Sequence, residues 1–162
     1  MGDLMWLKAS GLLACIWAMW AFLNLVAFCL SAALSEPTMA QYDGFRITIP
    51  EWLARALTPR ELAAFRQHEE GHRALRHPWK NLLRLCVFAP ASRATLREQE
   101  LEADEFVADP AAMASGIRKT SNTRFDLMRA SILEVRAKMK GGQEARSPAP
   151  GKGATEEGEG ST

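Results

Sequence analysis

Cysteine is scarce in this chain, and its placement excludes two kinds of small-protein scaffold. Of three cysteines in 162 residues, Cys15 and Cys29 fall in the apolar N-terminal segment, which leaves Cys86 alone in the remainder. A disulfide framework and a zinc knuckle both need paired cysteines. An excess of charge of one sign is lacking too, because the net charge is +1 and the basic residues are mixed with acids. We therefore expect neither a disulfide-stapled fold nor a nucleic-acid binder.

Histidine is also scarce, and its three copies, His68, His72 and His77, lie within ten positions. Residues four apart in a helix share one face, one turn above the other. His68 and His72 can therefore offer two imidazoles to one metal ion, while Glu69 leans over the same site. This H-E-x-x-H spacing is typical of zinc peptidases, in which the carboxylate handles protons. His77 points off that face, and we expect it to cap the C-terminal end of the helix.

The segment around the histidines predicts a capped amphipathic helix. Thr58 is a candidate N-cap, Pro59 occupies the first helical position and Glu61 completes a capping box, while Pro78 closes the segment. Residues at steps of three and four form one face of this helix: Leu62, Phe65, Glu69 and His72. The histidine face is therefore also the apolar, inward face.

A second helix is expected from a capping box of Thr95 and Glu98 to a stop before Pro110. One stripe of this helix faces inward and contains Leu96, Glu100, Ala103 and Val107. A hydrolytic zinc site needs a third protein ligand from another rigid element, and Glu100 meets that need. Asp104, one turn later, is placed to orient an imidazole from behind.

Residues 9–34 contain no charged side chain and predict a membrane segment after a short flank at residues 1–8. Twenty-six helical residues extend about 39 Å, more than the roughly 30 Å of a hydrocarbon layer. The apolar core of a cleaved signal peptide, the competing interpretation, is shorter, at about 7–15 residues. We therefore expect an uncleaved single-pass anchor, and Lys8 set against Glu36 and Asp43 slightly favours an inside N-terminus.

The remaining segments complete an α+β prediction. Gly44–Pro50 indicates a short strand. Residues 79–90 are apolar enough for a buried helix, a strand or a segment that dips into the membrane surface, and core packing is the default. A third helix is expected from Thr123 to Lys140, with a packing stripe of Phe125, Met128, Ile132, Val135 and Met139. Residues 141–162 are rich in Gly, Pro, Ser and Glu and predict a disordered tail.

Residues 44–109 resemble the gluzincin peptidases of the M48 and M56 groups, including the membrane heat-shock, CAAX-processing and β-lactam-sensor types. The resemblance is carried by "LTPREL" at 57–62, "HEEGH" at 68–72 and "ELEAD" at 100–104. It implies a small zincin-like domain over residues 35–140 with one Zn²⁺, held by His68, His72 and Glu100, and with Glu69 catalytic. Its partners would be a protein or peptide substrate and the lipid bilayer.

The chain departs from that family in the residue that stabilises the oxyanion. Relatives place a His, Tyr or Arg beyond the glutamate ligand, but here no His or Tyr follows Glu100. Arginines remain, including Arg118, Arg124 and Arg129. Removing an oxyanion donor costs about 10²–10³ in rate, so activity is expected to be slow or confined to particular substrates.

Three functions follow from these features. The first is a membrane-tethered zinc endopeptidase that binds extended peptide by β-addition along "FRITI", residues 45–49. The second is a catalytically weak or inactive zinc-binding sensor or interaction module at the membrane, which keeps its metal for stability. Structural zinc usually has four protein ligands, and the three found here favour the peptidase. The third, a membrane-disrupting protein, would leave the capped helices and aligned ligands without a purpose.

Overall fold

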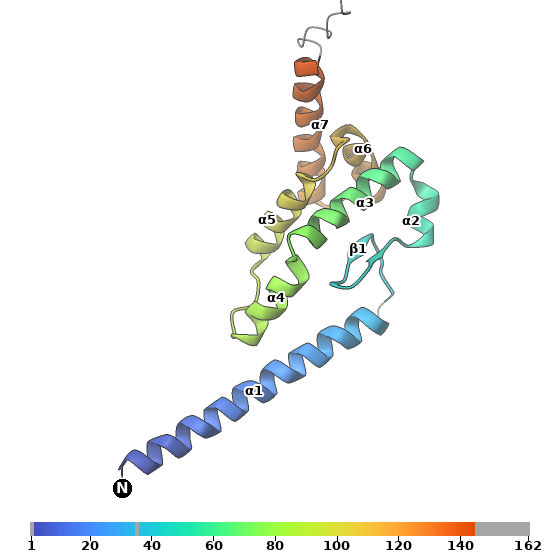
Figure 1. Ribbon diagram of the computed structural model, residues 1–162. Helices are drawn as coiled ribbons and strands as arrows, with labels where there is room; N and C mark the ends of the chain where they lie inside the picture. The colour runs from blue at the N-terminus through green and yellow to red at the C-terminus, as the bar shows by residue number, and fades with distance from the viewer. Residues whose placement is uncertain (1, 35, 145–162) are drawn as a thin grey trace, which may run out of the picture.

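The computed structural model describes residues 2–34 and 36–144, and the arrangement of their elements is shown in Figure 1. It is mostly helical, with one two-stranded antiparallel sheet that pairs Gln41 with Thr48 and Tyr42 with Ile47. The elements in chain order are α1 (Gly2–Leu34), β1 (Gln41–Tyr42), β2 (Ile47–Thr48), α2 (Glu51–Ala56), α3 (Pro59–Ala74), α4 (His77–Cys86), α5 (Arg93–Asp104), α6 (Pro110–Thr120) and α7 (Arg124–Glu144).

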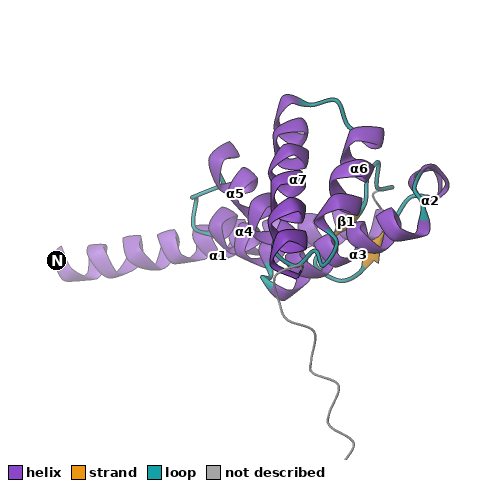
Figure 2. Ribbon diagram, turned by 90° about the horizontal axis from the view of Figure 1, so that it is seen from above, coloured by secondary structure: helices purple, strands orange, loops and turns teal. Residues whose placement is uncertain are grey.

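Helix α1 contains the predicted apolar segment and begins earlier than predicted, at Gly2. Its residues Lys8–Leu34 are long and apolar enough to cross a membrane. In Figures 1 and 2 its N-terminal half extends away from the other helices, while α4 packs against its middle and C-terminal parts. Residues 79–86 are therefore helical and pack on α1 instead of joining the main core.

An aromatic cluster ties α1 to the hairpin and to α4. Phe28 of α1, Phe45 of the hairpin and Trp79 of α4 have ring centroids 5.2–5.8 Å apart. The Trp79 indole N–H donates to the Gly44 carbonyl at 3.0 Å. Gly44 has a φ of +102°, and a Cβ there would lie 2.7 Å from the Phe28 ring. The turn therefore needs glycine both for its backbone conformation and for the close approach of α1.

The predicted cap of α3 is confirmed. The Thr58 hydroxyl accepts from the Glu61 amide, and the Glu61 carboxylate accepts from the Thr58 amide. Glu61 is itself buried and also accepts hydrogen bonds from Ser115 and Lys119 of α6. One carboxylate thus starts α3 and fixes α6 beside it.

The main core lies between α2, α3, α6 and α7. Its largest fully buried side chains are Leu53, Met113 and Leu133. Helices α6 and α7 run side by side in Figures 1 and 2 and make the most extensive helix pair. A Cβ at Gly116 would lie 2.6 Å from the Phe65 ring, so α3 and α6 approach closely there.

Several predicted elements differ from the structure. Helix α5 begins at Arg93 with Ser92 as N-cap and ends at Asp104, so the Thr95–Glu98 capping box was wrong. Helices α2 and α6 and strand β1 were not predicted, although Asp109 and Pro110 are an N-cap and first-turn proline for α6. Helix α7 continues to Glu144, past the predicted start of the tail, and residues 145–162 lie outside the described residues.

The predicted packing stripe of α7 was also wrong. Four of its five members are exposed: Met128, Ile132, Val135 and Met139. The helix instead buries Arg129, Ala130 and Leu133. Burial of Arg129 is possible because carboxylates of α5 neutralise it, and this contact sets the rotation of α7.

Candidate metal centre

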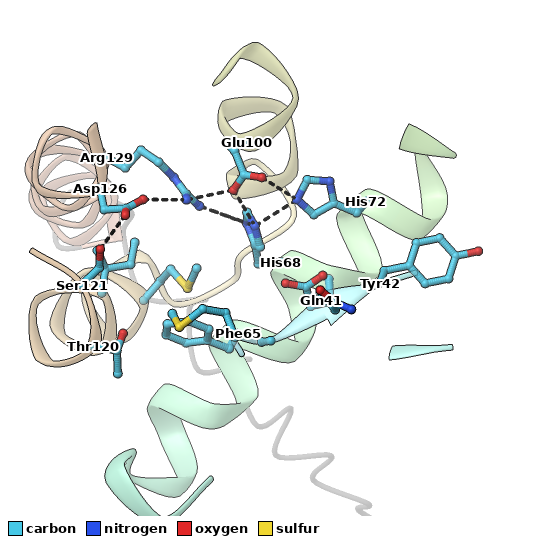
Figure 3. Close-up of a pocket in the computed structure, with 15 residues that line it drawn as sticks. Gln41, Tyr42, Phe65, His68, His72, Glu100, Thr120, Ser121, Asp126 and Arg129 are labelled. Carbon is cyan, nitrogen blue, oxygen red and sulfur yellow. Dashed lines mark hydrogen bonds and ion pairs between the residues drawn. The ribbon is translucent and has the colours of Figure 1, made fainter. Parts of the chain in front are cut away.

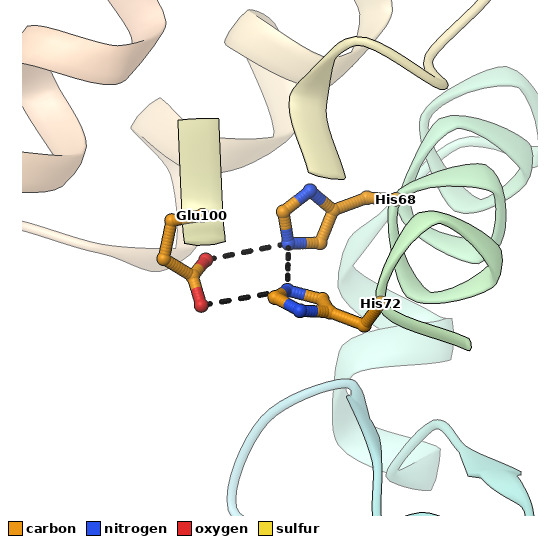
Figure 4. Close-up of side chains that lie close together, drawn as sticks. All are labelled: His68, His72 and Glu100. Carbon is orange, nitrogen blue, oxygen red and sulfur yellow. Dashed lines mark hydrogen bonds and ion pairs between the residues drawn. The ribbon is translucent and has the colours of Figure 1, made fainter. Parts of the chain in front are cut away.

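The structure brings the three predicted ligands together from two helices. His68 and His72 come from α3 and Glu100 from α5, and Figure 4 shows their side chains converging. The two Nε2 atoms are 3.1 Å apart, and the Glu100 carboxylate oxygens lie 3.3 Å from Nε2 of His68 and 3.5 Å from Nε2 of His72. A tetrahedral ion with bonds near 2.0–2.1 Å separates its donors by about 3.4 Å. The donor set therefore fits such an ion.

Gly71 allows α5 to approach α3 closely enough for Glu100 to reach the histidines. A Cβ at position 71 would lie 2.9 Å from the Ala103 carbonyl oxygen and 3.0 Å from its Cα. Both atoms belong to the α5 backbone, which cannot rotate aside as a side chain could. The glycine within H-E-E-G-H is thus needed for the packing that brings the third candidate ligand, Glu100, to the histidines.

Asp104 lies behind His68, as predicted. Its Oδ1 is 2.9 Å from His68 Nδ1, so the other ring nitrogen faces Glu100. Burial alone would lower the pKa of His68, but the hydrogen bonds to Asp104 and Glu100 outweigh burial and raise the pKa to about 9. Asp104 is buried and fixes the orientation of this imidazole.

His77 has a different place from the one predicted. Arg76 adopts a left-handed conformation (φ 55°) between the end of α3 and the start of α4, and His77 is the first residue of α4. The buried His77 ring has Nδ1 2.8 Å from His72 Nδ1 and Nε2 3.0 Å from Glu102. It is therefore not a C-terminal cap, and it orients His72 as Asp104 orients His68.

Arg129 is the buried cation of the centre, and the sequence did not distinguish it from the other arginines. It makes a two-pronged contact with Asp104 at 2.8 and 2.9 Å, and its Nη1 is 2.9 Å from Glu100. Arg118 instead pairs with Glu134, and Arg124 is exposed at the start of α7. Burial would raise the pKa of Glu100, but the two histidines and Arg129 hold it well below its usual range.

The three candidate ligands and Arg129 line a cavity of about 340 Å³ (Figure 3). Glu69 lines the same cavity. The Glu69 side chain is buried, and burial raises the pKa of its carboxyl against the opposing charges of His68 and His72. A carboxylate thus lies in the same cavity as the candidate metal ligands.

Strand β1 and the two residues before it form one wall of this cavity, through Met39, Ala40, Gln41 and Tyr42. The predicted docking segment, residues 45–49, does not line it, because β2 lies on the far side of β1. A peptide in the cavity would therefore meet β1.

In comparisons with known proteins, no family model matches the chain, and neither a curated protein nor a solved structure matches it. The resemblance to gluzincins therefore stays a prediction from the motifs.

Proposed function

We propose that the chain is a membrane-anchored zinc endopeptidase in which α1 is the anchor. The convergence of His68, His72 and Glu100 carries the proposal, because their donor atoms lie 3.1–3.5 Å apart, with Oε2 of Glu100 near His68 and Oε1 near His72, and donors on a tetrahedral ion lie about 3.4 Å apart. Two imidazoles and one carboxylate form the donor set of a catalytic zinc site with one position open. Bound zinc polarises a carbonyl group and lowers the pKa of water to about 7.

The residues around the ligands divide the remaining work. Glu69 accepts the proton of the attacking water and delivers it to the leaving amine, since it lies in the same cavity. Arg129 also lines that cavity, and its ion pairs with Asp104 and Glu100 hold the carboxylate behind His68 and the candidate ligand Glu100 in place.

Substrate binds as an extended strand along β1. Backbone hydrogen bonds at a strand edge give affinity with little sequence specificity. Because α1 confines the domain to a bilayer, the substrates are unfolded protein segments at or near the membrane surface.

A metal-stabilised sensor module is the alternative, and the donor count opposes it. Structural zinc usually takes four protein ligands. Among the described residues the group that could hold an ion has three members. The nearest further candidates are engaged elsewhere: Asp104 with His68 and Arg129, and His77 with His72 and Glu102.

Replacing Glu69 by glutamine tests the proposal. The full chain in detergent is assayed for bound zinc and for casein cleavage, with and without a chelator. We expect Glu69→Gln to keep its zinc and to lose about 10²–10⁴-fold in rate. Glu70→Gln is the matched control, since Glu70 is exposed and pairs only with Arg73 among the contacts described. Wild-type protein that binds zinc but cleaves nothing would refute the peptidase and support the module.

A further inference from the structure

We propose that residues 79–88, which comprise α4 after its first two residues and the turn that follows, enter an anionic bilayer beside α1 and form a second membrane-inserted element. The inference rests on the anchoring role of α1 in the proposed function and is independent of the peptidase chemistry.

The first observation is where α1 and α4 meet. The indole N–H of Trp17 donates to the Cys86 carbonyl at 3.0 Å, and that of Trp20 to the Leu85 carbonyl at 3.2 Å. The part of the candidate span before these contacts, Lys8–Ile16, is nine residues long, or about 14 Å of helix. This is half of a hydrocarbon layer of roughly 30 Å. If α1 crosses the layer and keeps this packing, the end of α4 must enter with it.

The second observation is the surface that α4 presents next to α1. Leu83 and Phe88 are 66% and 62% exposed, and Val87 between them is also exposed. The groove between the two helices is lined by Ala21, Phe22, Leu25, Trp79, Leu82, Leu83 and Cys86. Large apolar side chains grouped in this way, continuous with an apolar anchor helix, match the lipid-facing side of an interfacial helix.

The third observation is that the end of α4 does not depend on water for its backbone hydrogen bonds. A helix normally leaves its last four carbonyls without intrahelical partners, and hydrocarbon cannot supply them. Here all four accept hydrogen bonds: Leu83 from Val87, Arg84 from Ala89, Leu85 from Phe88 and Trp20, and Cys86 from Trp17.

Phe88 holds this turn closed. It adopts a left-handed conformation (φ 58°), which is unfavourable for a bulky residue and is normally given to glycine at a helix end. Its ring stacks on Trp20 with centroids 5.3 Å apart and an interplanar angle of 16°. The strained residue is thus kept where its side chain lies against α1.

The fourth observation is charge. The whole chain is nearly neutral, but residues 71–97 contain six basic residues and no acid. Lys80 and Arg84 are exposed on α4 itself. Long basic side chains beside an inserted apolar surface extend toward anionic headgroups, so the expected occupant is an anionic lipid bilayer.

Nitroxide labels on single cysteines test the insertion in the full chain. The three native cysteines are replaced by alanine, and the protein is reconstituted into vesicles of phosphatidylcholine with a minority of phosphatidylglycerol. Labels at Leu83 and Phe88 report on α4 and its turn, and a label at Leu23 reports on α1. Val135 on α7 is the matched control, because it is as apolar and as exposed as the others. Circular dichroism checks that each labelled protein is folded.

At Leu83, Phe88 and Leu23 we expect the collision rate of the nitroxide with oxygen to be severalfold higher than its collision rate with a water-soluble nickel chelate, because oxygen concentrates in hydrocarbon. Val135 should show the reverse preference. Lipid exposure at Leu23 with aqueous behaviour at Leu83 would overturn this inference and leave the anchor intact. Aqueous behaviour at all four positions would overturn the anchor and the inference together. The Leu83 label decides if labelling at Phe88 disturbs the turn, because Leu83 makes no stacking contact in the structure described.

Discussion

Replacing Gly71 by alanine should loosen the metal centre, even though alanine usually stabilises a helix interior by about 1 kcal/mol over glycine. The added Cβ would lie 2.9 Å from the Ala103 carbonyl oxygen, whereas ordinary contact begins at 3.4 Å. Helix α5 must therefore retreat by about 0.5 Å, the tolerance within which a site must hold its groups. Overpacking of this kind costs about 1–3 kcal/mol, which cancels or exceeds the helical gain.

The assay is a zinc competition titration against a fluorescent chelator, combined with thermal unfolding. We expect Gly71→Ala to bind zinc at least about tenfold more weakly, a loss of 1.4 kcal/mol. Gly141→Ala is the control, because Gly141 also lies in a helix but has nothing within 4 Å of the place where a Cβ would lie. It should leave zinc affinity unchanged and gain about 0.5–1 kcal/mol in stability. A Gly71→Ala protein with undiminished zinc affinity would refute the packing argument.

Three further predictions use the same preparations. Asp104→Asn should weaken zinc binding about 10–100-fold in the chelator titration, because His68 loses its charged acceptor, while the exposed Glu105→Gln should not. Lys119 and neighbouring hydroxyls overcome the effect of burial and lower the pKa of Glu61 to about 2, so the folded state binds fewer protons there than the unfolded chain. The stability advantage over Glu61→Gln should be complete at neutral pH and be lost in unfolding curves as pH falls from about 4.5 to 2. Removing zinc should lower the thermal midpoint, and restoring zinc should reverse the change. The corresponding loss in the free energy of unfolding is about 2.7 kcal/mol when free zinc had been 100 times its Kd.

The sequence predicts α3 and the convergence of its two histidines with Glu100 because the signals are local. The cap at Thr58 and the four-residue spacing of His68 and His72 depend only on neighbouring residues in one helix. Glu100 and Asp104 are also four apart, so one helix can place one at the candidate ion and the other behind an imidazole. The contact of Glu100 and Asp104 with α3 could be expected because the sequence places both residues on the inward face of α5 and the histidines on the inward face of α3.

The surroundings of the ligands could not be predicted, because they depend on contacts between distant residues. Arg129 is buried only because Glu100 and Asp104, on another helix, neutralise it, and this contact turns the more apolar stripe of α7 outward. His77 reaches His72 only because Arg76 takes a left-handed conformation, for which its side chain gives no signal. In both places a polar network overrides hydrophobic periodicity.

The aromatic cluster of Phe28, Phe45 and Trp79 has a consequence for substrate choice. It joins α1 to the hairpin whose strand β1 walls the cavity, so the cavity is held at a fixed position relative to α1. For the proposed membrane-anchored peptidase, the distance of a peptide bond from the membrane would then decide whether it is cleaved, and the identity of the residues at that bond would matter less.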